Sequence, residues 1–527
     1  MPLSASEPYD LAVIGAGSAG LAGAVTAGEL GLSVVLLDTS THTGGQFYRT
    51  PAPALGAVRP EALHHDWSAY ADLRRRLAQS DVRHLAGHHV WSVTKDDEAA
   101  GVWSVHAVTG ADGGGERPVR VQCRAVLLAT GAYERQLPFP GWTLPGVVGA
   151  GGAQAMLKSG LVLPGIGVSP ARAKSRARGR VVVAGSGPLL LAVASSLAAA
   201  GARVPAVVEA SGYLRYARHP RALVTNPHKA AEALVHGAAL LWHRVRVRLR
   251  SAVTEVHGTD RVEAVTVTRL DRDWRPVQGT GRRIDCDALA VGHGLVPQVD
   301  LATALGCATR PLPDGTRALA LDGVQETSVR SLWAAGETGG VGGAQLARVE
   351  GELAAVAAAA RLLGRPAHAG RVRELQRRRD HMRAFAEVMS AAHAPGPGWA
   401  HRLPDDTDVC RCEEVTAGRI REAVEDLGAR DARTVKLLTR AGMGWCQGRM
   451  CGPAVACLVA RDQDPEPLAE RRPFAAPVPL SALAALDDPV VSEPGGDANA
   501  PGGQSETTSE PYAAPEAARE AAPGADG

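Results

Sequence analysis

The stretch LAVIGAGSAG, residues 11–20, decides the fold of the first part of the chain. Its apolar half predicts a buried strand, its glycines predict a tight turn, and the Ala-rich run that follows predicts a helix. A second apolar run at Val34–Leu37 completes a strand–helix–strand unit. Asp38 ends that run, 23 positions after Gly15. The sequence therefore predicts a dinucleotide-binding unit at residues 11–38.

The glycines of this GxGxxG pattern have separate physical roles. Gly15 permits the tight turn, Gly17 lets a pyrophosphate approach the backbone, and Gly20 lets the helix pack closely on the strand. The phosphates then meet the N-terminus of the helix. A carboxylate after the second strand can accept hydrogen bonds from both ribose hydroxyls. The expected contacts are Gly15, Gly17, Ser18, Ala19, Gly20 and Asp38.

A second unit of the same kind opens near Arg180, where VVVAG precedes a Gly-Pro turn and an Ala- and Leu-rich helix. Gly185 and Gly187 take the first two glycine positions, and Glu209 ends the next strand. A carboxylate there suits an adenosine ribose and repels a 2′-phosphate, which favours NAD over NADP. Leu190 replaces the third glycine. The unit is therefore predicted to bind NAD(H) or another adenine nucleotide, or to be a retained fold without one.

The rest of the chain divides by composition. The stretch 163–179 is rich in Pro, Gly, Ser and basic residues and predicts a loop. Between Ala239 and Leu289, alternating stretches such as VRVRLR and VEAVTVTRL predict strands of a small antiparallel layer. An Ala-rich run from Ala344 predicts a helix. The stretch 492–527 contains almost no large apolar residue, so we expect it to be disordered.

Composition and charge exclude several classes of protein. The 527 residues suffice for three or four domains, and 45% apolar with 21% charged residues is typical of a globular protein. A net charge of +2 creates no field that attracts nucleic acid. No run approaches the ~18 unbroken apolar residues of a membrane span, and the first residues lack the basic segment of a secretory signal. We therefore expect a cytoplasmic protein with no membrane span and no nucleic-acid partner.

The most specific pattern is a set of four cysteines near the C-terminal end. Cys410 and Cys412 lie in CRC, and after 33 intervening residues Cys446 and Cys451 lie in CQGRMC. Four thiolates in two close pairs can hold a [2Fe–2S] cluster, with one pair on each iron, or one tetrahedral zinc ion. Zinc sites usually have two residues between paired cysteines, so the spacing favours the cluster. Zinc and free or dithiol cysteines are the alternatives.

Two distant segments complete the first site. AVLLATGAYER at Ala125–Arg135 and SLWAAGE at Ser331–Glu337 both predict buried strands that end in turns. With the GxGxxG unit they make Tyr9–Leu363 resemble the FAD-dependent pyridine nucleotide-disulfide oxidoreductase superfamily. The resemblance implies that FAD binds the first site, that Glu337 contacts a ribityl hydroxyl, and that the loop Gly44–Gln46 lies beside the isoalloxazine. The further contacts that it implies are Gly45, Gln46, Thr130, Gly131, Gly336 and Glu337.

The redox cysteine pair of disulfide reductases is missing from this segment. Cys123, Cys286 and Cys307 stand alone in the sequence. Disulfide reduction is therefore not the expected activity.

The cysteine module resembles the bacterioferritin-associated ferredoxin-like [2Fe–2S] domain. With GAYERQLPFPGWTLPGVVGAGGAQ and VGHGLVPQ also present, Tyr9–Val459 resembles the FAD-containing alpha-type subunit of opine oxidases, hydroxyproline dehydrogenases and hydrogen cyanide synthases. The resemblance implies that the partner is a glycine-oxidase-like flavin subunit, often with a small ferredoxin-like chain.

The predicted fold class is α/β: a two-dinucleotide-binding-domain flavoprotein, with a Rossmann-like FAD domain and an inserted NAD(P)-like domain, followed by a small mainly helical [2Fe–2S] domain. The expected ranges are 1–150 and 296–395 for the two parts of the FAD domain, 151–295 for the inserted domain, 405–462 for the [2Fe–2S] domain, and 463–527 for an extension with a disordered C-terminal tail.

The combination of cofactors predicts electron transfer. FAD exchanges electrons in pairs or singly, whereas the cluster carries them singly. We therefore expect an FAD- and [2Fe–2S]-dependent oxidoreductase, the electron-transferring subunit of an amino-acid or opine-type dehydrogenase complex. The alternatives are a self-sufficient NAD(P)H-dependent reductase that passes electrons through both centres to a small carrier, and a non-enzymatic iron–sulfur sensor or scaffold. The motifs contain no nucleophile–base pair, so no catalytic acid or base is predicted.

Overall fold

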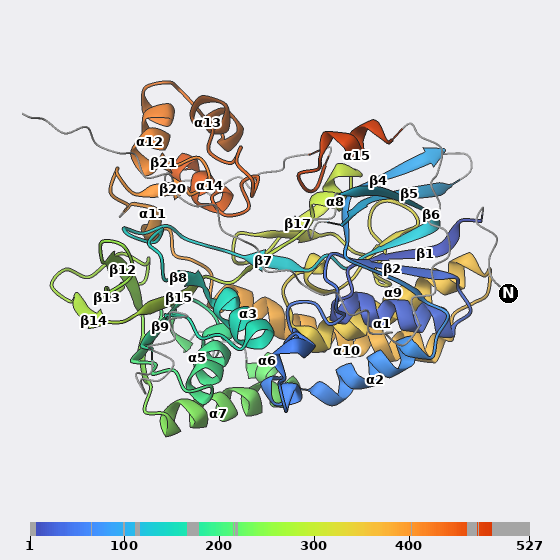
Figure 1. Cartoon of the computed structure of the whole chain (residues 1–527), viewed down its shortest axis with the longest axis horizontal. Helices are drawn as coiled ribbons and strands as arrows, with labels where there is room; N and C mark the ends of the chain where they lie inside the picture. The colour runs from blue at the N-terminus through green and yellow to red at the C-terminus, as the bar shows by residue number, and fades with distance from the viewer. Residues whose placement is uncertain are drawn as a thin grey trace, which may run out of the picture.

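The computed structural model contains two strand–helix–strand units side by side and a small helical module that packs on the second of them (Figure 1). It describes residues 7–64, 66–97, 101–110, 116–165, 179–213, 216, 220–401, 403–460, 472 and 474–486. The predicted loop at 163–179 lies mostly outside these ranges, and the predicted tail at 492–527 lies wholly outside them.

A seven-stranded sheet forms the centre of the first unit, in the order β3-β2-β1-β6-β5-β4, with β19 paired to β6. β1 pairs in parallel with both β2 and β6. Helix α1 is the crossover that lets β2 run parallel to β1. The strands β4, β5 and β6 pair antiparallel. The bounds are β1 (Tyr9–Ile14), β2 (Val34–Asp38), β3 (Arg83–Ala86), β4 (His88–Asp97), β5 (Val102–Thr109), β6 (Arg117–Leu128) and β19 (Leu332–Ala334).

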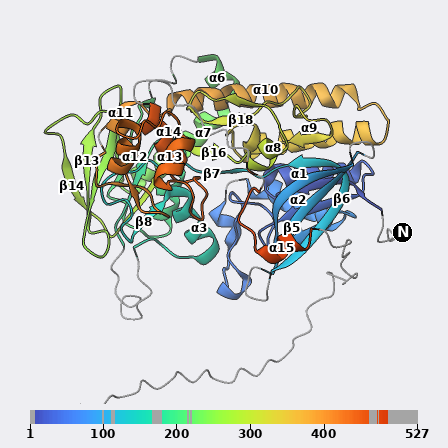
Figure 2. The same cartoon turned by 90° about the horizontal axis from the view of Figure 1, so that it is seen from above.

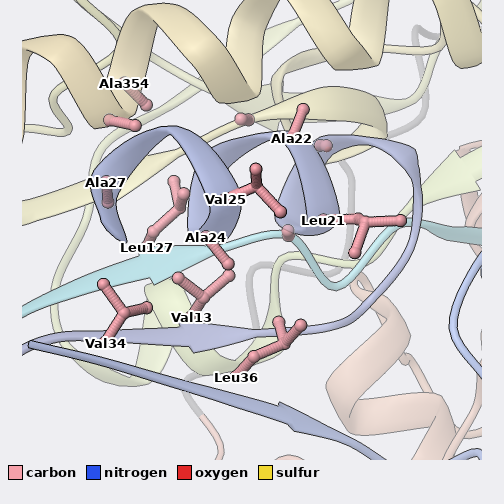
Figure 3. Packing of buried hydrophobic residues seen from close by; sticks show 14 of the residues in the cluster. Val13, Leu21, Ala22, Ala24, Val25, Ala27, Val34, Leu36, Leu127 and Ala354 are labelled. Carbon is pink, nitrogen blue, oxygen red and sulfur yellow. The ribbon is translucent and has the colours of Figure 1, made fainter. Parts of the chain in front are cut away.

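Helices α1 (Ser18–Glu29) and α9 (Ala344–Leu362) cover one face of this sheet. Figure 3 shows α1 between the sheet and α9, with small side chains on the facing surfaces. A Cβ on Gly351 would lie 2.0 Å from the Ala19 carbonyl oxygen, so the two helices touch through backbone at this point. The glycine- and alanine-rich sequence of both helices therefore sets how closely they pack.

A five-stranded parallel sheet forms the second unit, in the order β11-β10-β9-β15-β8. The prediction for VRVRLR was wrong: β11 (Arg246–Leu249) pairs in parallel with β10 instead of joining the antiparallel layer. Helix α7 (Pro227–Trp242) precedes β11 and acts as the crossover that a parallel neighbour requires. The other bounds are β8 (Val147–Gly149), β9 (Val181–Gly185), β10 (Ala206–Glu209), β15 (Ala288–Gly292), α3 (Ala150–Gly160), α5 (Leu189–Ala199) and α6 (Pro220–Thr225).

The stretch VEAVTVTRL does lie in an antiparallel layer, as predicted. It supplies β13, between β12 and β14. Two short strands, β7 and β16, pair antiparallel where the chain crosses between the two units. The bounds are β12 (Ser251–His257), β13 (Ala264–Arg269), β14 (Arg282–Asp285), β7 (Ala132–Glu134), β16 (Leu295–Pro297), β17 (Thr309–Pro311) and β18 (Arg317–Leu319).

The C-terminal module is mainly helical, and its core, which includes Ile420, Val435 and Val455, is continuous with buried residues of the second unit such as Ala252 and Leu270. Helix α10 lies along α9 and leads to the module, and α15 lies back against the first sheet (Figure 2). Ala482 and Leu483 of α15 pack in a buried cluster with Trp91 of β4, and Phe474, which precedes α15, packs edge to face on the Trp91 ring. The bounds are α2 (Trp67–Ala78), α8 (Asp300–Ala304), α10 (Ala369–Ala392), α11 (Gly398–His401), β20 (Asp408–Cys410), β21 (Val415–Thr416), α12 (Ala417–Glu425), α13 (Ala432–Thr439), α14 (Gly452–Ala460) and α15 (Leu480–Ala484).

The predicted fold class is confirmed: two dinucleotide-binding-type units and a small helical module make up an α/β chain. Within the ranges that the structure describes, no helix is both long and apolar enough to span a bilayer.

Candidate functional site

The first glycine turn combines tight packing with one open position. A Cβ on Gly15, whose φ is +105°, would lie 2.4 Å from the Ala129 carbonyl oxygen, and one on Gly20 would lie 1.8 Å from the Gly15 oxygen. At Gly17 the nearest atom to such a Cβ is 4.0 Å away. The turn is therefore closed where strand and helix meet and open at the glycine expected to face a pyrophosphate.

Asp38 holds this turn in shape. Its Oδ2 accepts a hydrogen bond from the Ala16 N–H at 2.5 Å, and its Oδ1 accepts one from Ser40 N–H at 2.7 Å. Each carboxylate oxygen has a second lone pair, and the side chain is half-exposed. The carboxylate can therefore order the loop and still receive a ribose hydroxyl.

The loop Gly44–Gln46 lies directly on the glycine turn. Gly44 N–H donates to the Ala16 oxygen at 2.7 Å, and a Cβ on Gly45 would lie 2.9 Å from the Gly17 Cα. The structure thus brings these two predicted segments together. The Gln46 side chain accepts from Arg49 Nε at 2.7 Å.

Gly336 and Glu337 reach the same place from the other end of the chain. A Cβ on Gly336 would lie 2.9 Å from the Ala19 Cβ. Glu337 accepts hydrogen bonds from the N–H groups of Gly342 at 2.7 Å and Gly343 at 3.0 Å, so its carboxylate caps the start of α9. Burial raises the pKa of the Glu337 carboxyl. The two glycine N–H groups therefore use part of the hydrogen-bonding capacity of the Glu337 carboxylate.

Thr130 and Gly131 lie where the chain leaves the first sheet. The Thr130 hydroxyl donates to the Gln298 oxygen at 2.8 Å, and Gly131 has a φ of +77°. Gln298 N–H in turn donates to the Gly131 oxygen at 2.9 Å. These predicted residues therefore join the two crossing strands beside the site.

Three charged residues near the site were not predicted from the sequence; Glu350 and Lys158 are buried and Glu134 is half-buried. Glu134 accepts from Gly151 and Gly152 N–H at 2.8 and 3.3 Å, where α3 begins. Glu350 accepts from Gly336 N–H at 2.9 Å and pairs with Arg383. Burial raises the pKa of both carboxyls. AYER after the ATG strand was a visible signal for Glu134, whereas Glu350 lies within an ordinary helical pattern.

The third of these residues is Lys158 on α3. Its ammonium group donates to the Phe47 carbonyl oxygen at 2.9 Å and lies 5.2 Å from the centre of the Phe47 ring. The side chain is buried, and burial lowers its pKa from 10.5 to about 8. It thus places a positive charge beside the segment that follows Gln46.

The second glycine turn repeats the bonding pattern of the first. Gly187 N–H donates to Glu209 Oε2 at 3.0 Å, and Ser211 N–H donates to Oε1 at 2.8 Å. Ser186 N–H donates to the Gly292 oxygen at 2.9 Å, and a Cβ on Gly185 would lie 1.7 Å from that oxygen. The structure therefore brings Gly185, Gly187 and Glu209 together, as the spacing predicts.

Unlike Asp38, Glu209 has no exposed surface. His393, at the end of α10, places its Nδ1 3.5 Å from Glu209 Oε1, and burial together with the nearby Glu209 carboxylate raises the pKa of the Tyr213 phenol. The Ser186 hydroxyl donates to the His393 carbonyl oxygen at 3.1 Å. The chain that leads to the helical module thus covers the acid expected to meet a ribose.

The four cysteines of the module lie as two pairs. The Cys410 side chain lies beside Cys451, and the Cys412 side chain lies beside Cys446. Within the described ranges, no group of three or more His, Cys, Asp or Glu side chains could hold a single metal ion. Each pair joins one cysteine of CRC to one of CQGRMC.

Backbone N–H groups point at the buried pair. The hydrogen bond from Cys451, together with the N–H groups of Gly442, Glu413 and Cys412, lowers the pKa of the Cys410 thiol to about 5. Cys410 is therefore set up as a thiolate, the form that binds iron. Cys457, on α14, lies outside the set, and burial raises its pKa to about 11.

The module is fixed to the two nucleotide units by specific bonds. Trp142 Nε1 donates to the Asp408 oxygen at 2.7 Å, two residues before Cys410. Arg449, between Cys446 and Cys451, pairs with Asp300 of α8 at 2.9 Å. The cysteine loop is therefore held against the body of the protein.

Comparison with known proteins identifies both parts. Residues 9–360 match the family described as pyridine nucleotide-disulphide oxidoreductase, and residues 409–461 match the BFD-like [2Fe–2S] binding domain. The chain belongs to the pyridine nucleotide-disulphide oxidoreductase family. It is a flavin oxidoreductase with a C-terminal [2Fe–2S] domain, and the two matches imply FAD and a [2Fe–2S] cluster.

Several relatives are similar over most of the chain. The sequence is 34% identical to the HcnB subunit of hydrogen cyanide synthase from Pseudomonas aeruginosa over 453 residues, which cover 83% of this chain and 90% of the relative. It is 34% identical to the A subunit of opine oxidase from Agrobacterium tumefaciens, covering 87% of each. L-proline dehydrogenase from P. horikoshii has the same fold, with a TM-score of 0.63 at 19% identity, covering 90% of this chain and 79% of that one.

The residues present fit both implied groups. The open space at Gly17 beside Asp38 suits the pyrophosphate and ribose of FAD. Two thiol pairs with a converging set of backbone N–H groups suit two iron ions better than one zinc ion.

Proposed function

We propose that this chain is the electron-transferring subunit of an amino-acid or opine-type dehydrogenase complex. The observation that carries the proposal is the contrast between its two nucleotide-type sites. The acid of the first, Asp38, is half-exposed, whereas the acid of the second, Glu209, is fully buried against His393, although Gly187 is as open as Gly17. A chain built this way has room for FAD and an obstructed place for NADH, so its electrons come from a partner that oxidises the substrate.

In this proposal each part of the chain has a defined task. When bound, FAD supplies two-electron redox chemistry and the cluster supplies one-electron chemistry. The first glycine turn and Asp38 bind the pyrophosphate and ribose, and Gly45, Gln46, Gly336 and Glu337 border the rest of the cofactor. Cys410, Cys412, Cys446 and Cys451 hold the cluster, and the buried Lys158 places positive charge beside the loop at 44–47.

The names of the relatives support a complex. HcnB of hydrogen cyanide synthase and the A component of opine oxidase are both named as subunits, and this chain covers 90% and 87% of their lengths. We propose that the partner is a glycine-oxidase-like flavin subunit, which oxidises an amino-acid-type substrate, with a small ferredoxin-like chain as a further component.

The test is NADH oxidation by the purified chain with an artificial electron acceptor. We expect no turnover with NADH, and acceptor reduction only after an amino-acid substrate is added together with the flavin subunit. Rapid NADH turnover by the isolated chain would establish instead a self-sufficient reductase. A protein without flavin absorption would indicate a sensor or scaffold.

A further inference from the structure

One edge of the cysteine module is open to solvent and is surrounded by apolar side chains. Cys412 is exposed and Cys446 is half-exposed, whereas Cys410 and Cys451 are buried. Beside the open pair, Trp445 is 82% exposed, and Leu437, Leu438 and Met443 are exposed as well. We call the surface formed by Cys412, Leu437, Leu438, Met443, Trp445 and Cys446 the redox face.

These residues lie on chain segments that touch one another. A Cβ on Gly444 would lie 2.3 Å from the Cys412 Cβ, so the loop with Met443 and Trp445 lies on the CRC turn. Arg440, at the end of α13, pairs with Glu413 at 2.9 Å. The end of α13, the loop and the CRC turn therefore form one continuous surface over the open sulfur pair.

The apolar side chains of the redox face do not stabilise the module. Its core is formed by buried residues such as Ile420 and Val435, and Trp445 projects away from that core with most of its surface in water. A cluster of exposed large apolar side chains in a folded protein usually marks an interaction site. Here the apolar cluster surrounds the sulfurs of Cys412 and Cys446, which give an electron the shortest path from the module to the protein surface.

The charges around the face favour an acidic partner. Arg411, Arg433 and Arg440 are exposed, and Arg440 keeps 72% of its side chain exposed although it pairs with Glu413. The nearby acids are Glu413, which pairs with Arg440, the exposed Glu414, and Asp431, which accepts from Thr434 N–H at the start of α13. With Lys436 counted among the bases, four positive charges stand against three negative ones, so the rim is net positive by one charge. An apolar centre with an arginine rim suits a partner whose own cofactor lies in an acidic surface.

The size of the face favours a transient partner over a permanent one. Four apolar side chains with their rim offer on the order of 500 Å², which lies in the range of weak electron-transfer encounters, roughly below 1,200 Å² in total. Obligate subunit contacts bury roughly 2,000 Å² or more. The redox face is therefore too small to be the main contact with a permanent subunit.

We propose that the redox face is the docking surface for a small acidic one-electron carrier protein. The proposal deepens the proposed function, because it names where the electrons leave. With FAD and the cluster bound, two carrier molecules in succession would each take one electron at the Cys412–Cys446 edge, and the flavin would supply both electrons and release its protons to water. The step therefore needs no reactant besides the carrier.

The experiment follows electron transfer out of the chemically reduced holoprotein. The anaerobically reduced chain is mixed in a stopped-flow instrument with oxidised plastocyanin, which is acidic, or with cytochrome c, which is basic. We expect plastocyanin to be reduced at least ten times faster at low salt, and the difference to shrink as salt screens the charges. Trp445→Ala should slow the plastocyanin reaction about tenfold, and Arg433→Glu should lower its rate and its salt dependence.

Trp242→Ala is the matched control, because Trp242 is 83% exposed and lies on α7 of the second unit. It should leave the rate unchanged, and all three variants should keep the flavin and cluster absorption of the parent. Equal rates with both carriers, or an unchanged rate in Trp445→Ala, would overturn the proposal. So would a Trp445→Ala variant that transfers electrons normally and fails to assemble with the flavin subunit, since the face would then be a subunit contact. The reduced chain needs no substrate or partner here, so the result is independent of the NADH test.

Discussion

In the first glycine turn, some glycines are needed for close packing and another is needed for contact with the cofactor. Gly15 and Gly20 are required by the meeting of strand and helix, because a Cβ on either would overlap backbone oxygen. Gly17 is not crowded, and its lack of a side chain keeps the turn open. The GxGxxG pattern predicts this division from the sequence, because it depends on backbone geometry within one short unit.

The cysteine assignment gives a prediction at a single sulfur. Cys446→Ser should abolish the visible bands and the iron signal of the cluster and leave bound FAD in place, because the ligand is lost while the first glycine turn is distant and unchanged. The measurement is the absorption spectrum with iron and flavin determination. Cys457→Ser is the control, since Cys457 lies outside the two thiol pairs, and it should keep the cluster. An intact iron spectrum in Cys446→Ser would contradict the ligand set.

Lys158 gives a prediction about pH. Its folded-state pKa of about 8 lies below the ordinary 10.5, so the folded protein holds the Lys158 proton less tightly than the unfolded chain does. The stability that Lys158 contributes is therefore complete above pH 10.5, decreases as the pH falls, and is lost once the pH has fallen through 8. Between pH 8 and 10.5 the free energy of unfolding of the parent should therefore rise by up to about 3 kcal/mol relative to that of Lys158→Met. Urea unfolding at several pH values measures this. Lys229→Met, at a Lys paired with Glu232 on α7, should show no such trend.

At the scale of elements, local periodicity predicts strands better than it predicts their partners. VEAVTVTRL and VRVRLR have the same alternating pattern, yet one lies in the antiparallel layer and the other in the parallel sheet. The difference is set by α7, which returns the chain to the parallel sheet before β11, and alternation carries no information about that crossover.

Contacts between elements that lie far apart along the chain could not be predicted from the sequence either. The spacing of Gly185, Gly187 and Glu209 predicts a second glycine turn and says nothing of what covers it. His393 lies 184 positions after Glu209 and reaches it only because α10 runs along α9 and ends there. Glu350 and Arg383 support Gly336 in the same way, from helices whose sequence pattern looks ordinary.

The contact of α10 with the second turn can be tested. His393→Ala should lower the free energy of unfolding by about 1–3 kcal/mol, because Glu209 and Ser186 lose buried polar neighbours. Thermal and urea unfolding measure this, with His42→Ala at an exposed loop position as the control. The unmodified protein should show no change in Tm with NADH, since its second site is covered. A clear rise in Tm with NADH would contradict the covered site.

At the scale of the whole molecule, one chain holds a flavin-type fold and a cysteine module in fixed contact. Arg449 links the CQGRMC loop to α8, and Trp142 links the second unit to β20, the strand that ends at Cys410. The sequence predicts both parts, because each has a local motif. It does not predict how they are joined, because the motif that contains Trp142 carries no information about its contact with Asp408, and Asp300 lies in no quoted motif.

The most direct test of the account is the cofactor content of the purified chain. FAD, iron, zinc and acid-labile sulfide are measured on one preparation together with its visible spectrum. We predict about one FAD, two iron and two sulfide per chain, because the four thiols form two iron-binding pairs. A colourless protein, or one with zinc and no labile sulfide, would contradict the account.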